Sequence, residues 1–226
     1  MTRHPLFWLP NLLTVARCLS SVFVAWIILA ISRHEASMAP AMILSSELAA
    51  THALASMQYR QFWGGIGLVV FVLAAFSDWL DGSLARRWNA QSRFGRLLDP
   101  IADKLAIGLP LLAIAAASEW ALPVALPVFV IIFRDVLITV LRFVGLGAGA
   151  MKVSIAAKIK TAYEMLVVAF FLFALATLSP ATALSGALLT SWLFALWGAA
   201  ILSAWTGIAY VIRLFGRPQP QSIAGE

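Results

Sequence analysis

The chain has 226 residues, of which 62% are hydrophobic and only 12% are charged, and its mean hydropathy is +0.92. This composition excludes a soluble domain of ordinary make-up and indicates a protein that lies in a bilayer. The formal net charge of +6 does not indicate a nucleic-acid partner, because the basic residues gather in a few short segments, as they do on the cytoplasmic flanks of membrane helices.

Six largely apolar stretches follow one another along the chain. A helix needs about 20 such residues to cross a bilayer. The stretches that meet this length are 11–32, 62–84, 97–118, 121–144, 157–178 and 185–213. We therefore expect an all-α integral membrane protein with six transmembrane helices. Residues 1–216 would form one membrane domain, and the polar residues 217–226 would be a disordered tail.

The basic residues set the expected orientation of these helices. Segments 85–96 and 142–160 each carry four arginines or lysines, which predicts that both lie in the cytoplasm. An even number of spans then places both termini there as well. On the other side, the polar connection 33–61 would be an external loop insertion, with a short helix near 48–57 on the membrane surface.

Four of the five aspartates lie close together, at the end of the second predicted span and the start of the third: Asp78, Asp81, Asp99 and Asp103. A spacing of three or four residues places the members of each pair on one face of a helix. Two facing helices would then bring four carboxylates together, and their mutual repulsion needs compensation. Either the arginines of 85–96 or divalent cations can supply it. The spacing alone therefore leaves a structural ion-pair cluster and a metal site open.

The residue types favour the metal site. Aspartates without a histidine or cysteine partner form a hard, all-oxygen ligand set, which suits Mg²⁺ or Mn²⁺ rather than zinc. Mg²⁺ is usually shared between a few carboxylates and phosphate oxygens, so the implied substrate is a phosphate ester or diphosphate. Three small residues, Gly82, Ala85 and Gly95, together with Arg86 would let a nucleotide approach the backbone, although small residues also serve helix packing.

The same residues carry a family resemblance. Their order is Asp78-x-x-Asp81-Gly82-x-x-Ala85-Arg86, eight residues, then Gly95-x-x-x-Asp99-x-x-x-Asp103. This pattern resembles the complete signature of the CDP-alcohol phosphotransferases. Further stretches, among them Pro10 to Arg17 and Lys158 to Thr161, are most similar to the phosphatidylglycerophosphate synthase branch, the CDP-diacylglycerol–glycerol-3-phosphate 3-phosphatidyltransferases.

The resemblance implies an activity and a set of roles. An enzyme of this branch transfers the phosphatidyl group of CDP-diacylglycerol to glycerol 3-phosphate and releases CMP, at the cytoplasmic face of the bacterial inner membrane and as a homodimer. Two divalent metal ions, Mg²⁺ or Mn²⁺, would be held by Asp78, Asp81, Asp99 and Asp103. Asp103 would also be the general base for the acceptor hydroxyl. The residues that would bind the CDP-lipid are Asp78, Asp81, Gly82, Ala85, Arg86 and Gly95.

Four basic residues in the second half of the chain are candidates for binding the acceptor: Arg134, Arg142, Lys158 and Lys160. Cations at the inner ends of spans can simply mark topology, but beside a metal-loaded site they favour an anionic acceptor such as glycerol 3-phosphate. Arg134 is followed by Asp135, where the synthase branch usually has Glu and where Arg-Asp resembles the cardiolipin synthases. Transfer to phosphatidylglycerol therefore stays open as an alternative. We expect Asp135 to pair with Arg134 or Arg142.

A membrane transporter is the remote alternative, because charged residues inside a membrane also mark transport pathways. Transport sites lie near the bilayer midplane between repeats. Here the aspartates lie at the ends of predicted spans, and the sequence has no visible inverted repeat. The pattern therefore favours an enzyme.

Overall fold

The structure is a computed structural model. It describes residues 9–39, 46–88, 93–143, 155–178 and 186–215, and side chains within 12–39, 49–77, 101–141, 156–178 and 186–214. These ranges contain helices and short turns, so the predicted all-α fold is confirmed for the described part of the chain. The six helices in them are α1 (Leu9–Met38), α2 (Ser46–Trp88), α3 (Arg93–Ala117), α4 (Leu122–Phe143), α5 (Ile155–Thr177) and α7 (Gly186–Phe215).

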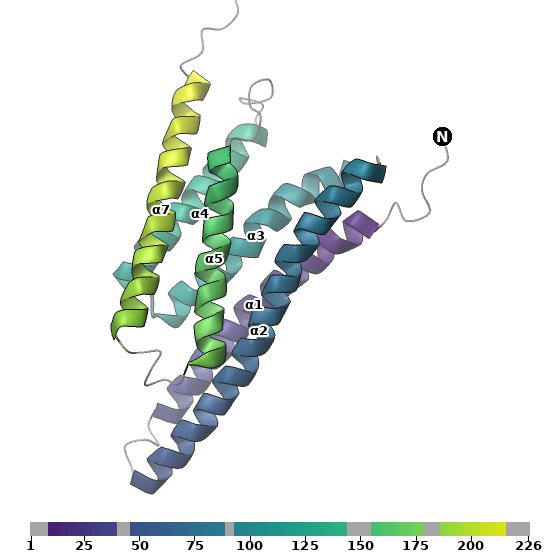
Figure 1. Cartoon of the computed structure of the whole chain (residues 1–226). Coiled ribbons are helices and arrows are strands. Elements are labelled where there is room, and N and C mark those ends of the chain that lie inside the picture. Colours follow the sequence, from purple (N-terminus) through teal and green to yellow (C-terminus); the bar gives the residue numbers. More distant parts are fainter. Residues whose placement is uncertain (1–8, 40–45, 89–92, 144–154, 179–185, 216–226) are drawn as a thin grey trace, which may run out of the picture.

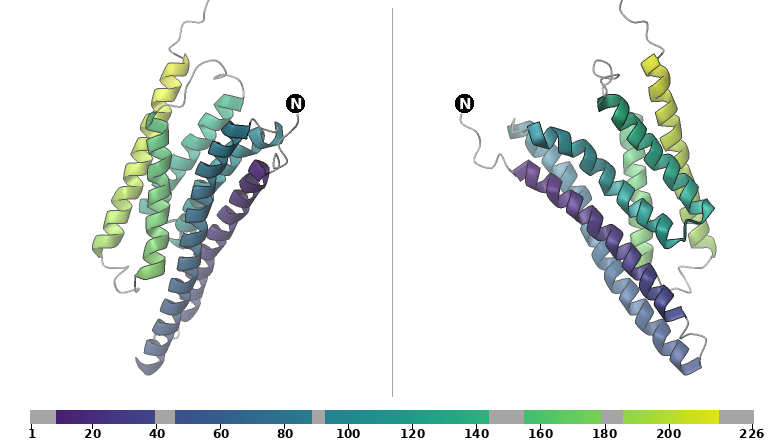
Figure 2. Two further views of the ribbon diagram at one scale, coloured as in Figure 1. Left: turned by 45° about the vertical axis from the view of Figure 1, so that its right-hand side comes forward. Right: turned by 180° about the vertical axis from the view of Figure 1, so that it is seen from behind.

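Successive helices run in opposite directions through the molecule (Figures 1 and 2). The start of α1, the end of α2 and the start of α3 lie at one end, together with the end of α4, the start of α5 and the end of α7. We call this the carboxylate end, because the predicted metal ligands belong to the parts of α2 and α3 that lie there. We call the opposite end the far end.

Five of the helices, α1, α2, α4, α5 and α7, contain stretches that are long and apolar enough to cross a membrane. Large apolar side chains project from their outward faces, and examples with most of their surface exposed are Phe62, Phe133, Leu166, Phe194 and Trp205. Soluble monomers rarely expose apolar patches of this extent, whereas lipid covers them. The protein is therefore a multi-pass membrane protein.

The polar connection predicted over residues 33–61 is mostly helical. α1 continues through its first part, and the helix expected near 48–57 is the beginning of α2 rather than a separate element. The His34 and Tyr59 rings stack across the two helices with their centroids 4.1 Å apart. Because the two polar segments support each other in this way, both helices continue past the far ends of α5 and α7, as Figure 1 shows.

The buried core fills the space between the helices. Its most enclosed apolar side chains, each no more than 2% exposed, include Ile27, Leu111, Ile114, Leu172 and Leu196. Close contact between helices in a membrane depends on small residues at the interface. Gly64 of α2 is one of them, because a Cβ at this position would lie 2.8 Å from the carbonyl carbon of Leu175 in α5.

A tight turn joins α3 to α4 at the far end. Glu119 and Trp120 have positive φ angles of 52° and 58°, and the N–H of Trp120 donates to the carbonyl of Ala115 at 2.9 Å, which closes the end of α3. Residues equally far from a short turn lie at the same depth in the two helices. Lys104 in α3 and Asp135 in α4 are equally far from the helix ends that adjoin the turn, so the turn brings them to one level.

Candidate functional site

The two predicted pairs of metal ligands lie on helices that are connected at the carboxylate end. Only residues 89–92 separate the end of α2 from the start of α3. Asp78 and Asp103 are equally far from those helix ends, while Asp81 and Asp99 both lie closer to them and differ by a single position. At 1.5 Å per residue, the first two are about 15 Å from the connection and the other two about 10 Å. The backbone therefore places the four residues as two pairs at matching depths.

The side chains of several predicted site residues lie outside the described part of the structure: Asp78, Asp81, Gly82, Ala85, Arg86, Gly95, Asp99 and Arg142. Their roles stay predictions. Among the described side chains, no group of three or more His, Cys, Asp or Glu residues could hold a metal ion. Of the four predicted ligands, only Asp103 belongs to the side chains described.

Asp103, the predicted general base, has an ion-pair partner on α1. Arg17 donates from Nη1 to Oδ1 of Asp103 at 3.0 Å. The Arg17 side chain is only 4% exposed, whereas the Asp103 side chain is 52% exposed, so much of the carboxylate remains accessible. Sequence reasoning had considered the arginines of 85–96 as partners for the aspartates. The packing of α1 against α3 supplies this additional one.

A small cavity lies beside the Arg17–Asp103 pair. Helices α1, α2, α3 and α5 all contribute to its wall, and Ala74 and Ala75 are among the α2 residues that line it. These two alanines precede Asp78 by one turn of the helix. The cavity therefore connects the described base to the turn of α2 that carries the first predicted metal ligand.

A second group of charged side chains forms around Asp135 in α4. The carboxylate accepts hydrogen bonds from Lys104 of α3 at 3.0 Å, from the neighbouring Arg134 at 2.8 Å, and from Lys160 of α5. The expected pairing of Asp135 with Arg134 is confirmed. Two of the predicted acceptor residues, Arg134 and Lys160, are thus brought together by one carboxylate.

Glu164 completes this group, which we call the Asp135 cluster (Lys104, Arg134, Asp135, Lys160 and Glu164). Its Oε2 lies 2.9 Å from Nζ of Lys160, one turn back along α5. Both residues are only 1% exposed, and neither carboxylate oxygen of Glu164 has a hydrogen bond of good geometry to a described atom. With three cations and two carboxylates, the cluster has one positive charge in excess.

α7 holds the guanidinium of Arg134 in place. Arg134 donates from Nη2 to the hydroxyl oxygen of Thr206 at 3.0 Å. The next residue, Gly207, leaves room for the arginine stem, because a Cβ there would lie 2.7 Å from Cγ of Arg134. Four helices, α3, α4, α5 and α7, therefore converge on the Asp135 cluster.

The third described acceptor candidate, Lys158, does not join the cluster. Residues two apart on a helix point to nearly opposite faces, and Lys158 is exposed where Lys160 is buried. None of the ion pairs between described side chains includes Lys158.

Sequence reasoning missed Arg17, Lys104 and Glu164, and also Thr206, which accepts a hydrogen bond from Arg134. Glu164 could have been found, because it follows Lys160 by four residues and that spacing pairs opposite charges on a helix. The partners of the other three lie on helices distant in sequence. No local pattern indicates such contacts.

The sequence matches the family described as CDP-alcohol phosphatidyltransferase over residues 7–206, which is most of the chain and includes both groups of charged residues. The chain belongs to this family. The predicted resemblance is thereby confirmed, and the four aspartates fall within the matched region.

Several curated relatives share the name CDP-diacylglycerol–glycerol-3-phosphate 3-phosphatidyltransferase. That of Cereibacter sphaeroides is 41% identical over 112 residues, which cover 49% of this chain and 51% of the relative. That of Sodalis glossinidius is 36% identical over 148 residues, or 63% of this chain and 75% of the relative. The Escherichia coli protein is 38% identical over 110 residues, or 46% and 59%. The matches thus span between half and three quarters of these relatives.

Proposed function

We propose that this chain transfers the phosphatidyl group of CDP-diacylglycerol to glycerol 3-phosphate, giving phosphatidylglycerophosphate and CMP. The curated relatives named for this reaction support the proposal. The observation that carries it is that a carboxylate and a positively charged cluster lie next to each other at the carboxylate end. An accessible carboxylate, Asp103, stands directly before Lys104, which belongs to a cluster with excess positive charge.

The four aspartates are the proposed ligands of two divalent ions, Mg²⁺ or Mn²⁺. The matching depths of Asp78 with Asp103 and of Asp81 with Asp99 support this assignment, because carboxylates on two connected helices can then share a site. The half-exposed Asp103 is a suitable oxygen donor at the edge of that site. When bound, the ions would neutralise the charge of the CDP diphosphate and of the departing CMP.

The proposed step begins at Asp103. Its carboxylate takes the proton of the acceptor hydroxyl, and the acceptor oxygen forms a bond to the β-phosphorus of the CDP-lipid. The bond between that phosphorus and the bridging oxygen breaks, and CMP leaves with the oxygen. Arg17 orients Asp103 through the 3.0 Å contact, and the Asp103 side chain is 52% exposed, so the acceptor can approach it.

The Asp135 cluster is the proposed receiver of the acceptor phosphate. Lys104 is 36% exposed and forms its accessible edge, whereas Lys160 is buried at 1% exposure and Arg134 is largely covered at 13%. We infer that the phosphate contacts Lys104 first, and that Lys160 and Arg134 contribute positive potential from deeper in the protein. A dianionic phosphate compensates the excess charge better than a phosphodiester does. This favours glycerol 3-phosphate over phosphatidylglycerol.

The carboxylate end is proposed to face the cytoplasm of a bacterial inner membrane, with α3 as a sixth membrane crossing. The basic segments 85–96 and 142–160 adjoin this end of the molecule, as the distribution of positive charge in membrane proteins favours. Both chain termini would then lie in the cytoplasm.

The test uses the purified full-length chain in detergent with CDP-diacylglycerol and Mg²⁺. Glycerol 3-phosphate should stimulate CMP release and yield phosphatidylglycerophosphate, and a chelator should stop both. Phosphatidylglycerol in its place should give no product. Formation of cardiolipin instead would move the assignment to the alternative acceptor, and CMP release that persists in the chelator would refute the metal assignment.

A further inference from the structure

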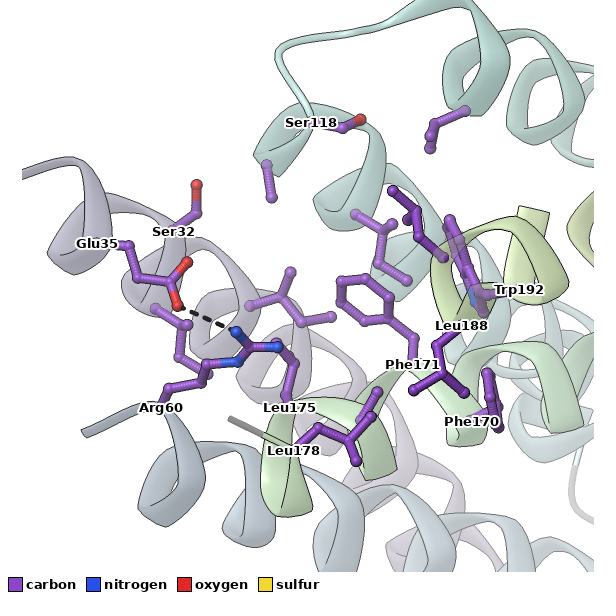
Figure 3. Close-up of a pocket in the computed structure, with 17 residues that line it drawn as sticks. Ser32, Glu35, Arg60, Ser118, Phe170, Phe171, Leu175, Leu178, Leu188 and Trp192 are labelled. Atoms are coloured by element: carbon purple, nitrogen blue, oxygen red, sulfur yellow. Dashed lines mark ion pairs between the residues drawn. The ribbon is translucent and has the colours of Figure 1, made fainter. Parts of the chain in front are cut away.

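A separate pocket lies at the far end of the molecule, with lining residues from all six described helices (Figure 3). The last residue of α3, Ala117, lines it and lies well beyond Asp103 on the same helix. At 1.5 Å per residue, the rise along α3 between these two residues is about 20 Å. The pocket is therefore distinct from the site at the carboxylate end, and an inference about it does not depend on the proposed reaction.

The wall of the pocket is mainly apolar. Phe171, Leu175 and Trp192 are part of it, and in the view of Figure 3 Phe171 lies between Trp192 and Arg60. At its rim Phe170 and Leu189 are 38% and 43% exposed, so the cavity reaches the lipid-facing surface. Its volume of about 280 Å³ lies just below the usual range of ligand pockets, which is about 300–1,000 Å³. This space suits part of one acyl chain.

One side of the pocket carries a pair of opposite charges. Arg60 of α2 is only 8% exposed, and its Nη1 lies 3.7 Å from Oε1 of Glu35 on α1, which is longer than a hydrogen bond. Nε of Arg60 is buried and has no hydrogen-bond partner among the described atoms. A buried guanidinium with such a loose partner is costly unless a further group satisfies its donors. The Glu35 side chain is 39% exposed and can meet a ligand from the outside.

The pair lies at the depth where lipid head groups are found. Ser118, which starts the α3–α4 turn, also lines the pocket. Trp120 in the same turn is 48% exposed and stacks on Phe129. An exposed tryptophan at the end of a span is typical of the membrane–water interface. The apolar wall thus faces the acyl region and the charged pair faces the head groups of one leaflet.

We propose that this pocket binds a zwitterionic phospholipid, with an acyl chain along the apolar wall, its phosphate at Arg60 and its ammonium group at Glu35. Charge complementarity selects this occupant. The pair has no net charge, so the carboxylate of Glu35 would repel a lipid whose head is only anionic. A head group that carries both signs satisfies the two side chains at once.

Lipid binding to the delipidated full-length chain tests the proposal, measured by native mass spectrometry. The probes are phosphatidylethanolamine and phosphatidylglycerol with identical acyl chains. We expect the first to bind several-fold more tightly. Arg60→Gln should weaken its binding about tenfold, the loss of one charge-assisted hydrogen bond. Glu35→Gln should remove the preference between the two lipids. Arg33→Gln is the matched control, because Arg33 is an exposed arginine of α1 that does not line the pocket. It should change neither the affinity nor the preference between the two lipids.

A further variant separates pocket binding from general adhesion of lipid. Ala174→Phe places a large side chain in the pocket, leaves both charged residues unsubstituted and should weaken binding of both lipids, whereas Ala162→Phe on the exposed side of α5 should not. Equal binding of both lipids by the unmodified chain, tighter binding of phosphatidylglycerol, or an Ala174→Phe variant with unchanged affinity would each overturn the proposal. So would the absence of lipid binding, which would mean that something other than lipid fills the pocket.

Discussion

Replacement of Asp135 by asparagine removes the charge that holds the Asp135 cluster together. Three cations share this carboxylate, and two of them, Lys160 and Arg134, are nearly buried. Loss of one partner from a buried ion pair costs about 3–5 kcal/mol, because the remaining charge is left uncompensated. We expect Asp135→Asn to cost about this amount in total, and not this amount for each of the three cations. Lys104 is 36% exposed and partly solvated, and Lys160 keeps its contact with Glu164.

For a chain of this size, 1 kcal/mol corresponds to about 2–4 °C in melting temperature. Asp135→Asn should therefore lower the Tm of the detergent-solubilised protein by about 10 °C in a thermal unfolding experiment. Asp135→Glu is the matched control, because it keeps the charge and should remain within a few degrees of the unmodified chain.

A double variant tests the reasoning itself. If the damage in Asp135→Asn comes from an uncompensated Lys160, then Lys160→Met should be much less harmful in the Asp135→Asn background than in the unmodified chain. Simple additivity of the two Tm changes would show that the residues do not interact energetically. An equal loss of stability in Asp135→Asn and Asp135→Glu would show that side-chain shape, and not charge, matters at this position.

Three further predictions follow from contacts described above. Asp103→Asn should lower kcat at least about 100-fold, because it removes the proposed base, while equilibrium binding of the CDP-lipid stays nearly unchanged; equal loss in both assays would argue against that role. Lys104→Gln should raise the KM for glycerol 3-phosphate more than the KM for CDP-diacylglycerol in steady-state kinetics, and an unchanged acceptor KM would place the phosphate elsewhere. Gly64→Ala should destabilise the protein in thermal unfolding, because its Cβ would lie 2.8 Å from the backbone of Leu175, whereas Gly65→Ala meets nothing within 4 Å and should be tolerated.

The elements of the fold were largely predictable, because each apolar stretch is long enough to cross a bilayer and reads as one helix. All six predicted stretches coincide with helices over most of their length. The extension of α1 and α2 was not predicted, since 33–61 is polar and lacks a lipid-facing pattern. Its helical form depends on contacts between the two helices, such as the stacking of His34 on Tyr59. The sequence of either helix alone does not indicate such a contact.

The candidate site, like the fold, was predictable from the sequence only in part. The spacing of the four aspartates is a local pattern, and so is the adjacency of Arg134 and Asp135, which the structure confirms as an ion pair. The contacts of Arg17 with Asp103 and of Lys104 with Asp135 join residues 86 and 31 positions apart. They require knowledge of which helices pack together. The sequence therefore indicated that the aspartates need positively charged partners. It could not identify Arg17 and Lys104 as those partners.

α3 connects the two halves of the proposed chemistry. Asp103 and Lys104 are consecutive, so their side chains leave the helix about 100° apart. One is directed to Arg17 on α1 and the other to Asp135 on α4. Any rotation of α3 about its axis would break both ion pairs together. The two contacts therefore fix α3 from both sides, and this places the proposed base and the accessible edge of the Asp135 cluster at a constant separation. A reaction between a nucleotide-linked lipid and a phosphorylated acceptor requires such a fixed separation, because the attacking hydroxyl and the acceptor phosphate belong to one small molecule.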